Sequence, residues 1–268
     1  MLAVERAQYI MAALEKNKVA LVADLSREMN VSEETIRKDM NKLEKEGKLY
    51  RVHGGAYLAE GYGNETPVSV REKIYQEEKA LLGSKCMDYV AEKETIFLDC
   101  STTILHFAKQ LAFFEKKLTV ITNSFLIAQE LLKNPKIRLI LLGGELNRDT
   151  ESFYGYTVFE ALEKYHINKA FFSSAGLSED VGITDATQEE ADIRRKVLKQ
   201  SDQCFFVADS TKIGRNSTYV IGDFEHLDYL IVDQQIPKGR ERLLEQLKEH
   251  KVQVIVCRRS KNNGGDKN

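Results

Sequence analysis

Clusters of hydroxyl, amide and carboxylate side chains follow several apolar segments in this 268-residue sequence. They are Asp99–Thr103, Thr122–Ser124, Gly143–Glu145 and Asp209–Lys212. A hydroxyl-bearing loop before a helix can bind a phosphate, because free backbone N–H groups point out of the helix start. A single cluster of this kind is more typical of a helix N-cap or a tight turn. Four clusters in comparable positions indicate a site for a small, anionic, hydroxyl-rich ligand.

A second group of residues suited to binding lies near the N-terminus. From Thr35 to Gly54 there are six basic and three acidic residues, whereas residues 1–34 contain four basic and six acidic ones. The hydroxyl of Thr35 and the amide of Asn41 can hydrogen-bond to base edges. A local basic excess can mark a contact with phosphates, although such a run is also typical of a solvated helix face.

Three short helices are expected to position these N-terminal groups. Apolar residues at helical spacing predict helices over 3–16 and about 21–29. The third helix has the strongest start signal, because Ser32 is suited to an N-cap and two glutamates follow in the first turn. Gly47 marks its end. The apolar stripes are formed by Ala7, Ile10, Met11 and Leu14, by Leu21, Leu25 and Met29, and by Ile36, Met40 and Leu43.

The connection between the second and third helices is very short. Only Asn30 and Val31 precede the cap of the third helix, which predicts a helix-turn-helix. A basic segment over 48–58 with a Gly54-Gly55 turn predicts a β-hairpin that serves as a wing. These features indicate binding to double-stranded DNA, and a three-helix module for protein contacts is the alternative. The residues expected to contact DNA are Ser32, Thr35, Arg37, Lys38, Asn41, Lys42, Arg51, His53 and Gly54.

The N-terminal region resembles the DeoR-type helix-turn-helix. Its signature spacing is matched by Arg6, Ile10, Leu14, Ser32, Thr35, Ile36, Arg37, Lys38, Asp39 and Met40. The phrases Val31–Asp39 and Arg51–Ala56 are similar to the recognition helix and wing of the DeoR family. The resemblance implies a winged helix-turn-helix in a transcriptional regulator.

The rest of the chain alternates between apolar and amphipathic segments. This alternation predicts a Rossmann-like α/β fold with a mostly parallel sheet that helices cover on both faces. Ligands of such sheets bind beyond the carboxyl ends of the strands, where the polar clusters lie. The expected strands are Thr95–Asp99, Leu118–Thr122, Ile137–Leu142, Lys169–Ser173, Cys204–Asp209, Tyr229–Val232 and Val252–Cys257. The expected helices are about 71–90, 103–113, 124–133, 157–165, 187–200 and 239–249.

The sequence suggests the following domain organisation. The winged helix-turn-helix is expected at 1–58, with the helix-turn-helix at about 21–46, and a linker at 59–74. The linker is glycine-rich and polar between Glu60 and Thr66. A sensor domain is expected at 75–258 and a polar tail at 259–268.

The C-terminal clusters match the sensor domain of DeoR-family repressors, which is similar to ribose-phosphate isomerase-like and glucosamine-phosphate deaminase-like folds. The matching phrases are Glu78-Lys79, Ile96–Asp99, Thr102-Thr103, Thr122–Ser124, Gly143-Gly144, Ser152–Gly155 and Asp209–Lys212. The resemblance implies a repressor of a sugar catabolism operon that a phosphorylated sugar releases from DNA. It implies an effector pocket lined by Asp99, Ser101, Thr102, Thr103, Thr122, Asn123, Gly144 and Lys212. Ser101 replaces the glycine usual in the family's phosphate loop, and its Cβ could alter the loop's backbone or narrow the pocket.

Two other classes of protein stay open. A sugar-phosphate isomerase or deaminase with an appended DNA-binding module needs a general base, for which Asp185, Glu189, Glu190 and Lys212 are the candidates. The segment Asp185–Lys196 is equally typical of a charged helix start. An architectural DNA-binding protein without a ligand is the third class, against which the clustered strand ends argue. One winged helix offers few base contacts, so a homodimer or homotetramer is expected.

The composition argues against several other classes. The four cysteines are scattered and form no C-x-x-C pair, which argues against a zinc site and a disulfide framework. We therefore expect packed, reduced thiols, no metal and no cofactor. No apolar run is long enough to cross a bilayer, and the first residues lack a secretory signal. A cytoplasmic protein without a membrane partner is expected.

Overall fold

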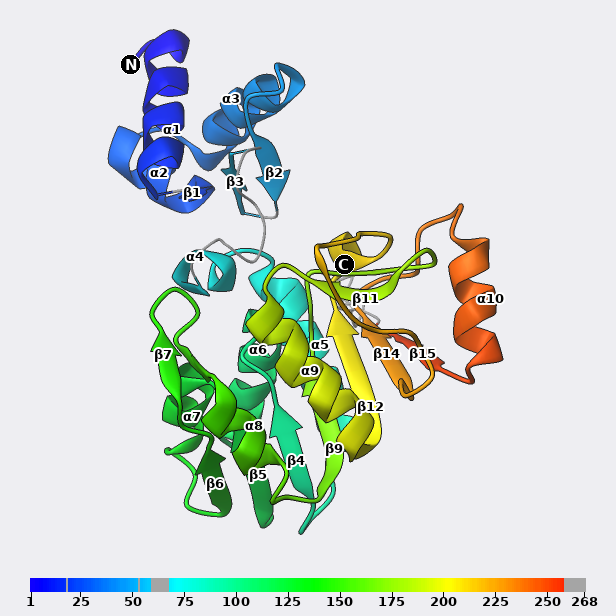
Figure 1. Ribbon diagram of the computed structural model, residues 1–268. Coiled ribbons are helices and arrows are strands. Elements are labelled where there is room, and N and C mark those ends of the chain that lie inside the picture. The colour runs from blue at the N-terminus through cyan, green and yellow to red at the C-terminus, as the bar shows by residue number, and fades with distance from the viewer. Residues whose placement is uncertain (18, 53, 59–67, 258–268) are drawn as a thin grey trace, which may run out of the picture. The chain divides into compact units, whose positions relative to one another are not determined.

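The computed structural model describes residues 1–17, 19–52, 54–58 and 68–257 (Figure 1). The chain divides into two compact units. The N-terminal unit comprises Met1–Gln76 together with Asn147–Glu151, and the C-terminal unit contains Glu77–Leu146 and the described residues from Ser152 onward.

The N-terminal unit contains the predicted three helices and wing. The helices are α1 (Ala3–Asn17), α2 (Val22–Met29) and α3 (Glu33–Lys45). The strands are β1 (Val19–Leu21), β2 (Tyr50–Val52) and β3 (Gly55–Tyr57), which form an antiparallel sheet in the order β1-β3-β2. The helix-turn-helix and the hairpin predicted from the sequence are confirmed, and β1 is an additional strand that no sequence pattern predicted.

Local signals explain the boundaries of α3. The hydroxyl of Ser32 accepts a hydrogen bond from the backbone N of Thr35 at 3.2 Å, as an N-cap does. Asn30, in the left-handed conformation at φ 51°, turns the chain between α2 and α3. Gly47 follows α3 at φ 70°, a conformation that glycine adopts without a steric cost. The predicted inward residues Ile36 and Met40 are fully buried.

The C-terminal unit is built on a seven-stranded sheet in which every neighbouring pair is parallel. Its strands are β4 (Thr95–Leu98), β5 (Leu118–Thr122), β6 (Ile137–Leu141), β9 (Ile167–Phe172), β12 (Ser201–Ala208), β14 (Tyr229–Val232) and β15 (Gln253–Val256). Their order is β15-β14-β12-β9-β4-β5-β6. All seven predicted strands are confirmed. The strand order reverses between β4 and β9, which makes the carboxyl end of this pair the switch point where such folds bind ligands.

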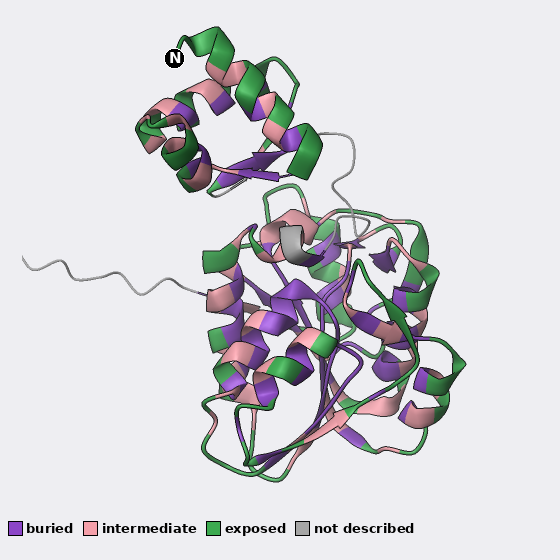
Figure 2. Cartoon of the chain, turned by 90° about the vertical axis from the view of Figure 1, so that its left-hand side faces the viewer, coloured by how far each residue is buried: buried purple, intermediate pink, exposed green. Residues whose placement is uncertain are grey.

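Helices cover both faces of this sheet, as the alternation predicts. One face packs against α5 (Gln76–Cys86), α6 (Thr102–Leu111) and α7 (Phe125–Leu131). The opposite face of the sheet packs against α8 (Tyr156–Leu162), α9 (Gln188–Gln200) and α10 (Glu241–Glu249). Successive residues of a strand enter different cores, with Phe171 on the first face and Phe172 on the second. Figure 2 shows buried strands enclosed by helices whose exposed residues lie on their outer sides.

Short elements complete the chain. A small antiparallel sheet contains β10 (Gly176–Ser178), β11 (Gly182–Asp185) and β13 (Tyr219–Gly222), and β7 (Glu145–Asn147) pairs with β8 (Ser152–Tyr154). The turns η1 (Met87–Tyr89) and η2 (Ser210–Lys212) are 3-10 helices. The expected linker includes helix α4 (Val68–Glu72), whereas its glycine-rich part lies outside the described residues. Within the described chain, no helix has the length and apolar character that crossing a membrane requires.

Candidate nucleic-acid interface and effector site

The expected DNA-contacting residues of α3 lie on its outer side. Arg37, Lys38, Asn41 and Lys42 are exposed, on the side of α3 away from the buried Ile36 and Met40. Thr35 is half-buried, and its hydroxyl lies 2.9 Å from that of the N-cap Ser32. This arrangement leaves a polar and basic helix face at the N-terminal half of α3, where recognition helices meet base edges.

Two of these basic side chains are paired within the helix itself. Arg37 donates to Glu33 at 2.6 Å, and Lys38 lies 3.0 Å from Glu34, both at i,i+4 spacing. Such exposed pairs contribute little stability, so phosphates or base edges could replace the carboxylates at low cost. Within the part of the chain that the structure describes, Lys42 forms no ion pair.

The wing is attached to α3 through Arg51. Its guanidinium donates to the carbonyl of Arg37 at 3.1 Å and to the side chain of Asn41, and its backbone N donates to Glu44 at 2.9 Å. Arg51 therefore fixes the angle between wing and recognition helix. Gly54, at φ 85°, forms the exposed turn of the wing, and its carbonyl accepts from the backbone N of Val22. His53, also expected to contact DNA, lies outside the described residues.

A salt bridge joins the first helix to the recognition helix. Arg6 of α1 donates to both carboxylate oxygens of Asp39 on α3, at 2.6 and 3.2 Å. Both side chains are about 15% exposed, and hydrogen bonding to Asp39 is the main cause that raises the pKa of Arg6. Arg6 and Asp39, which both belong to the DeoR-type signature, thus connect α1 to the inner side of α3.

Four of the eight expected effector residues follow β4, on one side of the switch point of the sheet. Ser101 caps α6: its hydroxyl accepts from the backbone N of Ile104 at 3.3 Å. Helix geometry leaves the N–H groups of Thr102 and Thr103 without an acceptor inside the helix, which suits an anion. Ser101 has φ −71°, an ordinary backbone conformation, so a side chain at the position usually held by glycine does not strain this loop.

The neighbouring strand end adds a polar group without a partner. The Nδ2 of Asn123 donates to the carbonyl of Phe153 at 3.1 Å, while its buried Oδ1 has no hydrogen-bond partner among the described residues. Thr122 is fully buried and accepts from the backbone N of Ser124 at 3.1 Å. Asn123 therefore brings an unused acceptor to the carboxyl end of β5, beside β4.

The two remaining effector candidates lie on more distant strands. Gly144 follows β6, and a Cβ on it would collide with the carbonyl O of Tyr154. The glycine is thus required by the close approach of the protein's own backbone. Lys212 is half-buried in η2, which follows β12. All expected effector residues lie at or after the carboxyl end of a strand of one parallel sheet.

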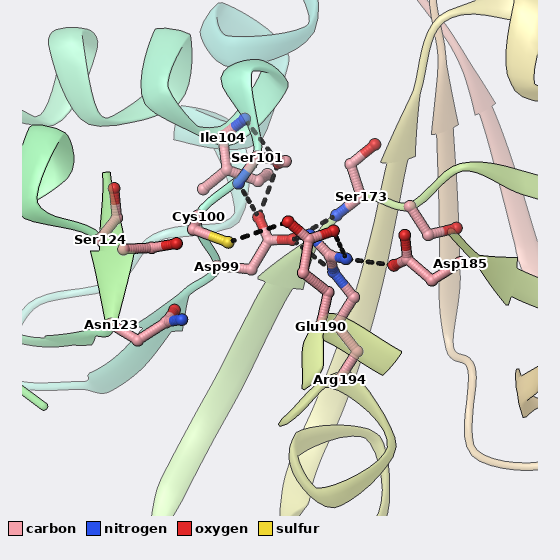
Figure 3. A network of polar contacts seen from close by, with 12 residues as sticks. Asp99, Cys100, Ser101, Ile104, Asn123, Ser124, Ser173, Asp185, Glu190 and Arg194 are labelled. Atoms are coloured by element: carbon pink, nitrogen blue, oxygen red, sulfur yellow. Dashed lines mark hydrogen bonds and ion pairs between the residues drawn. The ribbon is translucent and has the colours of Figure 1, made fainter. Parts of the chain in front are cut away.

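Asp99 bridges the two strands at the switch point (Figure 3). One carboxylate oxygen accepts from the backbone N and the hydroxyl of Ser101, at 3.1 and 2.6 Å. The other accepts from the backbone N of Ser173, after β9, at 3.2 Å and from Nε of Arg194 at 2.8 Å. Asp99 therefore holds the start of α6 against the end of β9. Its side chain is only 2% exposed, and both of its oxygens already have partners.

Arg194 of α9 connects Asp99 to two further carboxylates. One terminal nitrogen donates to Glu190 at 2.9 Å and to Asp185, and the other lies 2.7 Å from Asp99. All four side chains are 3% exposed or less. We call Asp99, Asp185, Glu190 and Arg194 the Arg194 cluster.

The Arg194 cluster contains three carboxylates and one guanidinium. Full ionisation would leave an excess of negative charge in the interior, which is costly there. Burial is the main cause that raises the pKa of Asp185 from 3.8 to about 7, and Glu190 adds to the rise while Arg194 opposes it. Burial acts to lower the pKa of Arg194, but the surrounding carboxylates outweigh it, and that pKa is raised.

Replacing Asp185 with asparagine tests this charge balance. The pKa of Asp185 in the folded protein lies above its ordinary value of 3.8, so the folded state binds this proton more tightly than the unfolded state does. This proton contributes its full stabilisation below about pH 4, and the contribution is lost as the pH rises to about 7. The loss amounts to about 4 kcal/mol. The Tm of Asp185→Asn relative to wild type should therefore rise between pH 5 and pH 8 in thermal unfolding. Asp192→Asn is the control, because Asp192 is a partly exposed carboxylate of α9 outside the Arg194 cluster. A Tm difference that stays constant over this range would contradict the raised pKa.

The role of Arg194 was not predicted from the sequence. Asp185 and Glu190 were candidates only as catalytic acids or bases, and neither Arg194 nor Ser173 was singled out. One signal was present: Glu190 and Arg194 share the i, i+3, i+4 stripe of the predicted helix with the apolar Ile193, Val197 and Leu198. Charged residues on an inward stripe indicate a buried ion pair.

A winged helix-turn-helix joined to a parallel α/β domain, with polar groups gathered at its switch point, defines a DNA-binding transcriptional regulator with a sensor domain. This chain belongs to the DeoR family. The DeoR-like helix-turn-helix domain matches residues 6–61, and the DeoR C terminal sensor domain matches residues 74–234. The fold class and family expected from the sequence are confirmed.

Relatives of similar length are named as regulators. The uncharacterized HTH-type transcriptional regulator YulB of Bacillus subtilis is 36% identical over 97% of this chain and 99% of its own. The transcriptional repressor GlcR of the same organism is 34% identical over 86% of this chain and 88% of its own. The L-fucose operon activator of Haemophilus influenzae is 28% identical over 94% of this chain and 99% of its own. Among solved structures, ribose 5-phosphate isomerase A of Methanocaldococcus jannaschii is 14% identical over 52% of this chain and 55% of its own, with a TM-score of 0.39.

Proposed function

We propose that this protein represses a sugar catabolism operon by holding α3 in the major groove of an operator, and that a phosphorylated sugar releases it. The observation that carries the proposal is the exposed face of α3. It presents Arg37, Lys38, Asn41 and Lys42 directly after a helix-turn-helix connection, beside a wing that Arg51 holds in place. Arginine and asparagine are suited to reading guanine and adenine edges, and lysine to binding phosphates.

The expected effector site fits a phosphorylated, hydroxyl-rich molecule. The start of α6 offers the N–H groups of Thr102 and Thr103 to an anion, and Asn123 offers an unused acceptor to a sugar hydroxyl. Lys212 adds a positive charge from η2. The relative named as an L-fucose operon activator supports a sugar operon, and the relative named as a transcriptional repressor supports a repressing role.

A regulatory role is favoured over a catalytic one. Two candidate bases, Asp185 and Glu190, are buried and bound to Arg194. A general base has to reach the proton that it removes, and these carboxylates already serve as acceptors for a guanidinium. Relatives that align with most of this chain are named as transcriptional regulators.

Tight operator binding requires more than one copy of the chain. A single recognition helix contacts few base pairs, so symmetric half-sites bound by a homodimer or homotetramer are needed for specific affinity. The sensor domain is the part that we expect to form the symmetric contact.

Operator release tests the proposed function. Full-length protein is titrated against a fluorescent duplex from its own promoter, with and without glucose 6-phosphate, fructose 6-phosphate, fructose 1-phosphate or ribose 5-phosphate. At least one of these compounds should raise the Kd for the promoter. Turnover of any of them would support the enzymatic alternative, and stronger promoter binding would reverse the proposed sign of regulation.

Replacing Lys42 with alanine should weaken binding to all DNA sequences to a similar degree. Lysine binds phosphate as a point charge and carries no sequence information, so one phosphate contact should be lost. The slope of log K against log salt concentration should fall by about 1. Anisotropy titrations of promoter and random duplexes at several salt concentrations measure both quantities. An unchanged slope would show that Lys42 does not contact the backbone.

A further inference from the structure

The hairpin formed by β7 and β8 contributes to both units of the chain. Strand β8 belongs to the C-terminal unit, whereas the last residue of β7 and the turn after it, Asn147–Glu151, belong to the N-terminal unit. Within the N-terminal unit, the carbonyl of Asp149 in this turn accepts a hydrogen bond of 2.7 Å from the backbone N of Val68, the first residue of α4. The hairpin is therefore a continuous stretch of chain that begins and ends in the C-terminal unit and has its turn in the N-terminal unit.

Strand β8 is bound directly to one expected effector segment. The backbone N of Phe153 donates to the carbonyl of Asn123 at 2.8 Å, and the Nδ2 of Asn123 donates back to the carbonyl of Phe153 at 3.1 Å. Ser152 and Ser124 form an isolated β-bridge. A change in the position of Asn123 would thus act on the backbone of β8.

The same strand is bound to the Arg194 cluster through Tyr154. Its hydroxyl accepts from the hydroxyl of Ser152 at 2.8 Å and donates to Glu190 at 3.3 Å. Glu190 binds Arg194, and Arg194 binds Asp99, which holds Ser101 at the start of α6. The side chain of Tyr154 is buried, so water does not replace these contacts readily.

We propose that Tyr154 is a positioning residue that couples the effector segments to the β7–β8 hairpin, and through Asp149 and Val68 to the segment leading to the DNA-binding domain. The proposal rests on the proposed function. Effector at the start of α6 shifts Asp99 and Arg194, and the Glu190–Tyr154 contact transmits that shift to β8. An effector can change the affinity for DNA only if it binds the DNA-binding arrangement and the released arrangement of the protein with different affinities. Weakening the Glu190–Tyr154 contact should therefore lower the coupling between effector and DNA.

Replacing Tyr154 with phenylalanine removes the hydroxyl and its contacts with Glu190, Ser152 and Cys100, while the ring keeps its packing. Tyr165→Phe is the matched control, since Tyr165 packs against the same core outside this chain of contacts. The coupling is the ratio of promoter Kd values with and without saturating sugar phosphate. The compound used is the one of glucose 6-phosphate, fructose 6-phosphate, fructose 1-phosphate and ribose 5-phosphate that raises the wild-type Kd most.

Tyr154→Phe should lower this ratio about threefold or more, while Tyr165→Phe leaves it unchanged. The Kd values for promoter alone and for sugar phosphate alone should stay within about twofold of wild type, which a merely structural role of Tyr154 would not predict. Ser152→Ala should lower the ratio in the same direction. A wild-type ratio preserved in Tyr154→Phe, or equal loss of all binding in that variant, overturns the coupling. A wild type that responds to none of the four compounds contradicts the proposed function, and the coupling with it.

Discussion

Replacing Arg194 with methionine is expected to lower the free energy of unfolding by about 3–5 kcal/mol. The guanidinium is 3% exposed and contacts Asp99, Asp185 and Glu190. Methionine fills much of the same volume but removes the guanidinium that all three buried carboxylates contact. Such groups must then be protonated or exposed to water, and either change costs stability. Because protonation relieves the repulsion, the loss should be smaller at pH 5 than at pH 8.

Urea denaturation of the full-length protein measures this effect, and Arg195→Met is the control. Arg195 is the next residue of α9, its side chain is 38% exposed, and it pairs with the partly exposed Asp192. Its replacement should change the free energy of unfolding by less than about 1 kcal/mol. Equal losses in the two variants would mean that the Arg194 cluster is no more important to the fold than a surface ion pair.

Replacing Arg37 with alanine is expected to reduce the preference for operator over random DNA by about 1–3 kcal/mol, or roughly 5- to 150-fold. Arg37 lies on the exposed face of α3, and among the described residues its guanidinium is bound by Glu33 four residues earlier. Base edges in the major groove can replace that carboxylate, and a bidentate contact to guanine is lost in the variant. The preference for operator, rather than affinity alone, is therefore the quantity that should fall.

Competition titrations of operator against random duplex at fixed salt concentration measure the preference. Arg242→Ala is the matched control, because Arg242 is also an exposed arginine paired with one carboxylate, that of Asp180, but it belongs to the sensor domain. The control should keep the wild-type ratio. If Arg37→Ala also kept the wild-type preference for operator over random DNA, α3 would not read bases through Arg37.

Much of the fold follows from local pattern. A parallel sheet covered on both faces needs strands that are apolar throughout, so strands such as Cys204–Asp209 are visible as short apolar runs. The caps Ser32 and Ser101 mark helix starts because their hydroxyls bind the first free N–H groups, and both do so in the structure. Strand β1 was missed because three residues carry too little periodicity, and pairing with β3 alone defines it.

The site is less accessible to sequence reasoning, because its contacts join distant parts of the chain. The polar clusters at the ends of the strands were predicted, because each cluster directly follows its strand in the sequence. The partner of Asp99 is Arg194, 95 residues later, and no local pattern specifies that pairing. Gly144 was expected to line the effector pocket, and no local pattern shows that the carbonyl of Tyr154 lies against it. The contact of each expected residue with DNA or effector stays a prediction.

The most direct test of the central claim is whether the intact protein binds its own promoter through α3. Full-length wild type and Arg37→Ala are titrated at low salt, without any metabolite, against a duplex carrying that promoter and against a scrambled duplex. We predict that wild type binds the promoter duplex much more tightly than the scrambled one, and that Arg37→Ala narrows this difference. A wild-type protein that binds neither duplex, or both equally, would contradict the account.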